Sequence, residues 1–111
     1  MAQPAEKPDV FQAIADPTRR EVLLMLIDKE LPISEITAHF PISRTAVVKH
    51  LLVLENARLI SGRKAGREKR YRMNPEPLAE VSQWLAYAER FWSNKLSMLQ
   101  HLVEHDDKKQ P

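Results

Sequence analysis

The sequence contains no cysteine and only two glycines among its 111 residues. Without cysteine, the chain cannot form disulfides, thiolate metal sites or a cysteine nucleophile. Two glycines cannot build a glycine-rich phosphate loop, and neither a His-Glu-x-x-His motif nor a nucleophile elbow is present. No apolar run approaches the roughly 20 residues that span a bilayer, and residues 1–8 lack the apolar stretch of a secretory signal. We therefore expect a cytoplasmic chain that is not an enzyme, needs no cofactor and does not enter a membrane.

Length and composition are typical of one small globular domain. Of the 111 residues, 43% are hydrophobic and 29% are charged, which suffices for a modest core and argues against wholesale disorder. We expect a flexible N-terminal arm over residues 1–8, a single domain over residues 9–105 and a polar tail over residues 106–111.

Positive charge is concentrated in one part of the chain. The whole chain carries a net charge of only +2, but residues 44–72 contain nine Lys/Arg against two acids, a net charge of +7. The remaining residues must then carry −5, so the molecule is electrically two-sided and its basic part suits a polyanion. The alternative is a solvated basic face without any partner.

Capping residues and apolar spacing predict four helices in the first half of the chain. They cover residues 9–15, 16–29, 34–40 and 44–57, with Asp9, Asp16, Ser34 and Ser43 as the respective N-caps. The second and third helices are expected to bury several apolar side chains, Ile27 and Phe40 among them. Because about three residues separate the last two helices, they have the spacing of a helix-turn-helix.

The second half predicts a basic hairpin and one long helix. Residues 59–64 and 68–73 are typical of two short strands around a turn at residues 65–67, and a helix is expected over residues 78–104. The expected fold class is mainly α with a small β-hairpin, arranged as a winged helix-turn-helix.

This order of elements favours double-stranded DNA as a partner, because a helix fits the major groove while a basic hairpin reaches phosphates or the minor groove. The core takes Val47, Leu51 and Leu54, so the helix turns its other side outward. There Arg44 suits guanine, Thr45 and Val48 suit thymine methyl groups, and Lys49 suits guanine or phosphate. The predicted DNA-contacting residues are Ser43, Arg44, Thr45, Val48, Lys49, Arg63, Lys64, Arg67, Lys69 and Arg70.

The long helix carries more apolar surface than a domain of this size can cover by itself. The simplest partner is the same helix of a second copy, joined by apolar residues of the first helix, which gives a two-fold homodimer and an imperfectly palindromic operator. The predicted dimer-interface residues are Val10, Phe11, Ile14, Trp84, Leu85, Phe91, Trp92, Leu99 and Leu102.

Several segments together resemble the ArsR/SmtB family of bacterial winged-helix repressors. They are Phe-Gln-Ala-Ile-Ala-Asp-Pro-Thr-Arg-Arg at 11–20, Ile-Ser-Arg-Thr-Ala-Val-Val-Lys-His-Leu at 42–51, the wing at 66–72 and Asn-Pro-Glu-Pro-Leu at 74–78. The resemblance covers about residues 9–104. It implies a homodimer through the first and last helices that binds a palindromic operator and represses transcription.

The sequence also departs from the pattern of that family. The stretch 34–40 lacks the cysteines of the family's metal sensors, so the chain looks like the metal-independent, autorepressor-like branch. Leu52 stands where a basic residue is common, and Arg58 stands where glycine usually ends the recognition helix. If Arg58 keeps the glycine conformation, its φ is positive, at a cost near 1 kcal/mol.

Two other functions remain open from the sequence. The long aromatic helix could serve a protein-interaction module in which the basic patch is incidental. Alternatively, His101, Glu104 and His105 could belong to a zinc-responsive sensor, although zinc would need further ligands from Asp106, Asp107 or a second subunit. We expect no metal, because a His-x-x-x-His pair near a helix end is usually only solvated.

Overall fold

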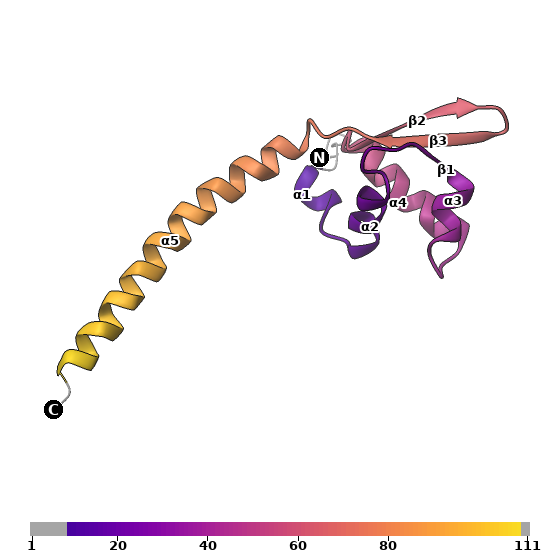
Figure 1. Cartoon of the computed structure of the whole chain (residues 1–111). Helices are drawn as coiled ribbons and strands as arrows, with labels where there is room; N and C mark the ends of the chain where they lie inside the picture. The colour runs from indigo at the N-terminus through magenta and orange to yellow at the C-terminus, as the bar shows by residue number, and fades with distance from the viewer. Residues whose placement is uncertain (1–8, 110–111) are drawn as a thin grey trace, which may run out of the picture. The chain divides into compact units, whose positions relative to one another are not determined.

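The computed structural model describes residues 9–109, with side chains through His105, and its contacts divide the chain into two compact units, residues 1–79 and 80–111. The predicted arm, residues 1–8, and the last two residues lie outside the described part. None of the described helices is long and apolar enough to cross a membrane. The elements in chain order are α1 (Val10–Ala13), α2 (Pro17–Met25), β1 (Leu31–Pro32), α3 (Ile33–Ala38), α4 (Arg44–Asn56), β2 (Ile60–Ala65), β3 (Glu68–Met73) and α5 (Leu78–Lys109) (Figure 1).

Three of the four predicted N-caps are confirmed. The side chains of Asp9, Asp16 and Ser43 each accept a hydrogen bond from the backbone N–H three residues further on, at 2.8, 3.0 and 3.1 Å. These bonds satisfy N–H groups that a helix cannot pair internally, and so they fix where α1, α2 and α4 begin. Pro17 takes the first position of α2, where its missing N–H costs nothing.

The prediction that Ser34 caps the third helix is wrong. α3 begins at Ile33, and its N-cap residue, Pro32, makes no side-chain capping hydrogen bond. The backbone N–H of Ser34 instead donates to Oε1 of Glu68 on β3, at 3.1 Å. The first turn of α3 thus receives its hydrogen-bond acceptor from Glu68, 34 residues further along the chain, and not from the neighbouring residues as expected.

Two helix ends differ from the prediction by about four residues or more, whereas α1 and α3 each end two residues before the predicted position. α2 ends at Met25 rather than near residue 29, because the chain turns there and Asp28 takes a positive φ of 58°. Ile27, expected in the core, is therefore 48% exposed, and Phe40 is only half-buried. α5 continues to Lys109, so residues 106–109 extend the long helix that was expected to end near residue 104.

The strands form an antiparallel sheet in the order β1-β3-β2, in which the two-residue β1 was not predicted. Leu31 pairs with Tyr71, and Gly62 on β2 lies opposite the same tyrosine. A Cβ at Gly62 would lie 2.9 Å from Cε1 of Tyr71, so this position requires glycine for the buried ring to fit. Gly66 begins the two-residue turn with a φ of 65°, a conformation that glycine adopts without strain.

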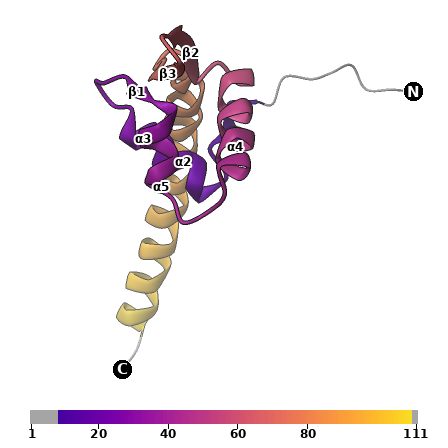
Figure 2. The ribbon, with the colours of Figure 1, turned by 90° about the vertical axis from the view of Figure 1, so that its right-hand side faces the viewer.

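The core of the first unit gathers around α4, which contacts α2, α3 and β2 (Figure 2). Val47, Leu51 and Leu54 are at most 1% exposed, as predicted, and no polar side chain is buried among the described residues. The mainly helical fold with a small hairpin is thus confirmed. It leaves one side of α4 and the far end of the hairpin uncovered.

Candidate nucleic-acid interface

The uncovered side of α4 presents a line of exposed side chains. With Val47, Leu51 and Leu54 packed inward, helical geometry points Thr45, Lys49, Leu52 and Asn56 the other way, and all four are exposed. The prediction that Thr45 and Lys49 face outward is therefore confirmed. The prediction did not include Leu52 and Asn56, although the three- and four-residue spacing from Thr45 and Lys49 was enough to find them.

Arg44 and Val48 lie on the flank of α4 rather than on this outermost line. Arg44 is exposed, and Val48 is half-buried. The pKa of the Glu68 carboxyl is lowered chiefly by hydrogen bonding to Ser34, and further by the positive charges of Arg44 and Arg70. Arg44, in the first turn of α4, is therefore near enough to β3 for its positive charge to act on the Glu68 carboxyl.

Arg19 fixes α4 to the first two helices. Its Nε donates to the carbonyl oxygen of Ala13 at 2.7 Å, and one of its terminal nitrogens lies 3.2 Å from Nδ1 of His50 on α4. A second terminal nitrogen donates to the carbonyl oxygen of Gln12 at 3.1 Å. One side chain thus satisfies carbonyl groups at the end of α1 and holds the helix that carries Thr45 and Lys49.

The hairpin of β2 and β3, here called the wing, extends away from α1 and α2, with its turn at the far end (Figure 1). Lys64 and Arg67 lie at or beside this turn and are exposed. Within residues 9–109, neither side chain has an ion pair or a side-chain hydrogen bond. Of the predicted wing contacts, these two cations are therefore available to a phosphate.

The other three predicted wing contacts have partners within the chain. Glu30 accepts two hydrogen bonds from Arg63, at 2.8 and 2.9 Å, and one from Arg70, at 3.2 Å. The Nζ atom of Lys69 lies 3.5 Å from Oε2 of Glu55 on α4 and 5.5 Å from the ring centre of Tyr71. The sequence prediction treated all five cations as equivalent, because these acids come from distant parts of the chain.

The residues predicted at a dimer interface fall into two groups. In the first unit, Phe11 and Ile14 are half-buried, but Val10 is only 6% exposed and belongs to the unit's own core. Val10 was therefore wrongly expected at an interface, because its side chain packs into the core of the first unit, whereas those of Phe11 and Ile14 stay partly exposed. In the second unit, the predicted residues are between 49% and 61% exposed; they are Trp84, Leu85, Phe91, Trp92, Leu99 and Leu102.

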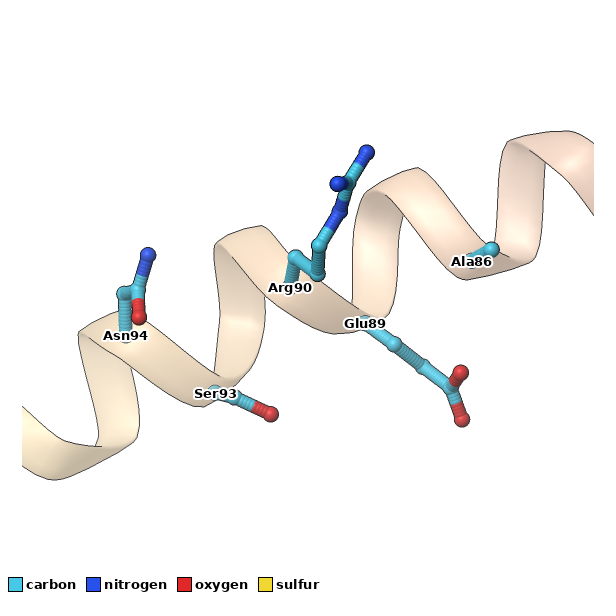
Figure 3. A pocket seen from close by; sticks show the side chains of 5 residues that line it. All are labelled: Ala86, Glu89, Arg90, Ser93 and Asn94. Carbon is cyan, nitrogen blue, oxygen red and sulfur yellow. The ribbon is translucent and has the colours of Figure 1, made fainter.

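The opposite face of α5 is polar and holds only a shallow hollow. Figure 3 shows its lining residues, Ala86, Glu89, Arg90, Ser93 and Asn94, which all project from one helix. No other described element forms a second wall, so the hollow lacks the enclosure of a ligand site.

Of the candidate zinc ligands on α5, the structure describes the side chains of His101, Glu104 and His105, whereas those of Asp106 and Asp107 lie outside the described part. The rings of His101 and His105 lie 4.0 Å apart, and Nδ1 of His105 is 3.2 Å from the carbonyl oxygen of His101. Among the residues that the structure describes, no group of three or more metal-binding side chains is found. Zinc usually takes four ligands, so this pair falls short by itself.

The chain matches known proteins over nearly the whole of this architecture. The family model described as "Bacterial regulatory protein, arsR family" matches residues 16–61, from the start of α2 to the first two residues of β2. The HTH-type transcriptional regulator Rv2034 of Mycobacterium tuberculosis is 37% identical over 96 residues, covering 86% of this chain and 87% of the relative. This chain belongs to the ArsR family.

Other members of the ArsR family support the same assignment. The transcriptional repressor SdpR of Bacillus subtilis is 35% identical and covers 69% of this chain and 86% of its own length. The crystal structure of the ArsR family transcriptional regulator RHA00566 aligns with a TM-score of 0.71 at 36% identity, covering 84% of this chain and 97% of that one. These relatives are named as regulators of transcription, and this ArsR-family chain is a DNA-binding transcriptional regulator with a winged helix-turn-helix.

Proposed function

We propose that this ArsR-family regulator is a repressor that binds a palindromic operator as a homodimer, with residues 9–105 forming the DNA-binding and dimerisation domain. In this proposal α4 enters the major groove, where Arg44, Thr45, Val48 and Lys49 read base edges and Ser43 lies near the backbone. The observation that carries the proposal is the outward, uncovered position of Thr45 and Lys49 opposite the core. Because the partner is bacterial chromosomal DNA, the protein would act in the cytoplasm.

The side chains on α4 suit the donors and acceptors of base pairs. A guanidinium such as that of Arg44 can bond two guanine acceptors at once, and a good bidentate pair discriminates by about 1–3 kcal/mol. The ammonium of Lys49 suits a guanine or a phosphate, while the methyl groups of Thr45 and Val48 suit the thymine C5-methyl. Leu52, at 50% exposure on the same side, adds a further apolar contact surface.

The wing supplies contacts that do not depend on sequence. Lys64 and Arg67 are exposed beside its turn and can approach phosphates next to the groove that α4 occupies. Each phosphate neutralised in this way releases condensed counterions, so affinity falls as salt rises. Reading and anchoring thus belong to different elements of the first unit.

The dimer is proposed from the apolar face of α5. Apolar residues occupy about half of the circumference of this helix, and Phe91, Trp92 and Leu99 on it are all at least 49% exposed. A second copy of the same face, together with Phe11 and Ile14, would remove these side chains from water. A two-fold axis would then set two α4 helices in successive major grooves, roughly 34–36 Å apart.

Selection of bound genomic fragments tests the proposed function directly. The bound fragments should share an inverted repeat, and the Arg44→Ala/Lys49→Ala variant should lose the preference for it in a gel shift. The Lys29→Ala/Arg90→Ala variant removes two exposed cations that belong to neither α4 nor the wing, and it should keep that preference. Fragments without a common sequence, or an unchanged preference in the first variant, would instead favour a protein-interaction module.

A further inference from the structure

The wing carries two cross-strand pairs of like charge. In the register of β2 and β3, Arg63 lies directly opposite Arg70, and Lys64 lies directly opposite Lys69. Like charges in such positions repel each other and destabilise the hairpin unless an opposite charge is close. In this chain, an acid from outside the wing lies near each pair, but only one of the two acids bonds both cations of its pair.

The first pair shares one carboxylate. Glu30 follows α2 and precedes β1, and it bonds the guanidinium groups of both Arg63 and Arg70. The backbone carbonyl of Glu30 accepts a further bond from Arg70, at 3.4 Å. In the second pair, Glu55 lies near Lys69 only, and Lys64 is left without a partner among residues 9–109.

We propose that Glu30 is a positioning residue that keeps Arg63 and Arg70 from contacting DNA, so that the phosphate contacts of the wing are made by Lys64 and Arg67. The inference rests on the proposed function, and it narrows the set of DNA contacts that the sequence suggests. In this arrangement Glu30 weakens the binding of the wing to DNA of any sequence. Recognition of a particular sequence then depends more on α4.

The geometry favours Glu30 over a phosphate as the partner of Arg63. Both oxygens of the carboxylate are engaged by Arg63, and the side chain of Glu30 is only 26% exposed. If both arginines left for the DNA, this carboxylate would remain unpaired beside a second anion, the phosphate. The internal pair is also already assembled, whereas a phosphate contact must order the arginine side chain at the DNA.

Salt dependence of DNA binding distinguishes an arginine that contacts phosphate from one that does not. The slope of log K against log salt changes by about 0.9 for each phosphate that the protein neutralises. We would measure it by fluorescence anisotropy, with a labelled duplex taken from the selected genomic fragments. Arg67→Ala should flatten the slope by about 0.9 for each bound chain, whereas Arg63→Ala and Arg70→Ala should leave it unchanged.

Removal of the acid should have the opposite effect. Glu30→Gln frees both arginines, so the slope should steepen by up to about 1.8 for each bound chain. The triple variant Glu30→Gln/Arg63→Gln/Arg70→Gln should return to the wild-type slope. Glu35→Gln removes one exposed acid of α3 that has no ion pair or side-chain hydrogen bond within residues 9–109, so this control raises the net charge equally and should leave the slope constant.

The outcomes separate the inference from the proposed function. If Arg63→Ala flattens the slope as much as Arg67→Ala, Glu30 releases its arginines on DNA and the inference alone is overturned. If Glu30→Gln leaves the slope unchanged while its far-ultraviolet circular dichroism matches the wild type, the inference is overturned as well. If Lys64→Ala and Arg67→Ala also have no effect, the wing does not contact DNA, and both the inference and the role proposed for the wing fail.

Discussion

The end of the recognition helix stores backbone strain that a single substitution should release. After α4, Arg58 takes a φ of 63°, so it keeps the conformation of the glycine that is usual at this position, which is one of the two outcomes that the sequence left open. Its N–H donates to the carbonyl of Glu55 and the N–H of Leu59 donates to that of Leu54, both at 2.9 Å. This is the Schellman pattern, with buried Leu54 and Leu59 in its expected hydrophobic pair. We therefore predict that Arg58→Gly stabilises the protein.

The magnitude follows from two opposing effects. The left-handed conformation costs a residue with a Cβ about 1–2 kcal/mol. Glycine avoids this cost but loses more chain entropy on folding, which costs about 0.5–1 kcal/mol. The net gain is about 0.5–1 kcal/mol, which for a domain of this size raises Tm by about 2–8 °C. Because Arg58 is exposed and its guanidinium has no partner within residues 9–109, its side chain contributes little to stability.

Thermal unfolding followed by circular dichroism, at equal protein concentrations, measures this gain. Arg58→Ala is the matched control, because it removes the charge but keeps the Cβ and hence the strain, so its Tm should stay near the wild-type value. Arg58→Asn should fall between the two, since asparagine tolerates a positive φ better than most residues. An equal rise in Arg58→Gly and Arg58→Ala would show that the charge of Arg58, rather than its backbone conformation, limits stability.

Three further predictions follow from other parts of the molecule. Leu99→Glu on the apolar face of α5 should convert a dimer to a monomer in sedimentation equilibrium, whereas Ser93→Glu on the polar face should not; no difference would contradict the proposed interface. Gly62→Ala should lower stability by about 1–3 kcal/mol in urea unfolding, since the new Cβ meets the buried Tyr71 ring. Arg72→Ala on the neighbouring strand serves as control, because Arg72 is exposed and has no ion pair or side-chain hydrogen bond within residues 9–109. The pKa of the Glu30 carboxyl is lowered below its usual 4.5, chiefly by hydrogen bonds from Arg63. The ionised Glu30 therefore contributes its full stabilisation of the folded state at a pH above 4.5. This stabilisation is lost as the pH falls through the lower pKa of Glu30 in the folded protein. The urea midpoint of the wild type should therefore fall more steeply at acid pH than that of Glu30→Gln; equal declines would exclude Glu30 as the cause.

Local sequence was sufficient for most of the elements and for the orientation of the recognition helix. Asp9, Asp16 and Ser43 are caps whose bonds reach only three residues along the chain, so their effect is contained in the sequence. The spacing of Val47, Leu51 and Leu54 likewise fixes which side of α4 is buried. The positive φ of Arg58 is another local property, set by the end of the same helix.

Contacts between distant residues could not be predicted in this way. The two-residue β1 is too short to show a periodicity. It forms because Leu31 pairs with Tyr71 on β3, which lies 40 residues further along the chain. Ser34 was expected to cap α3, but the acceptor for its N–H comes from Glu68. Val10 was expected at an interface, but packing within the first unit takes it into the core.

The amino-acid sequence by itself determined that this chain has a helix-turn-helix, a basic hairpin and a long apolar-faced helix, because caps, turns and helical periodicity act over a few residues. Only the tertiary structure decided which of its cations are free to meet DNA. Glu30 lies 33 residues from Arg63 and 40 from Arg70, and charges pair according to distance in space rather than distance along the chain.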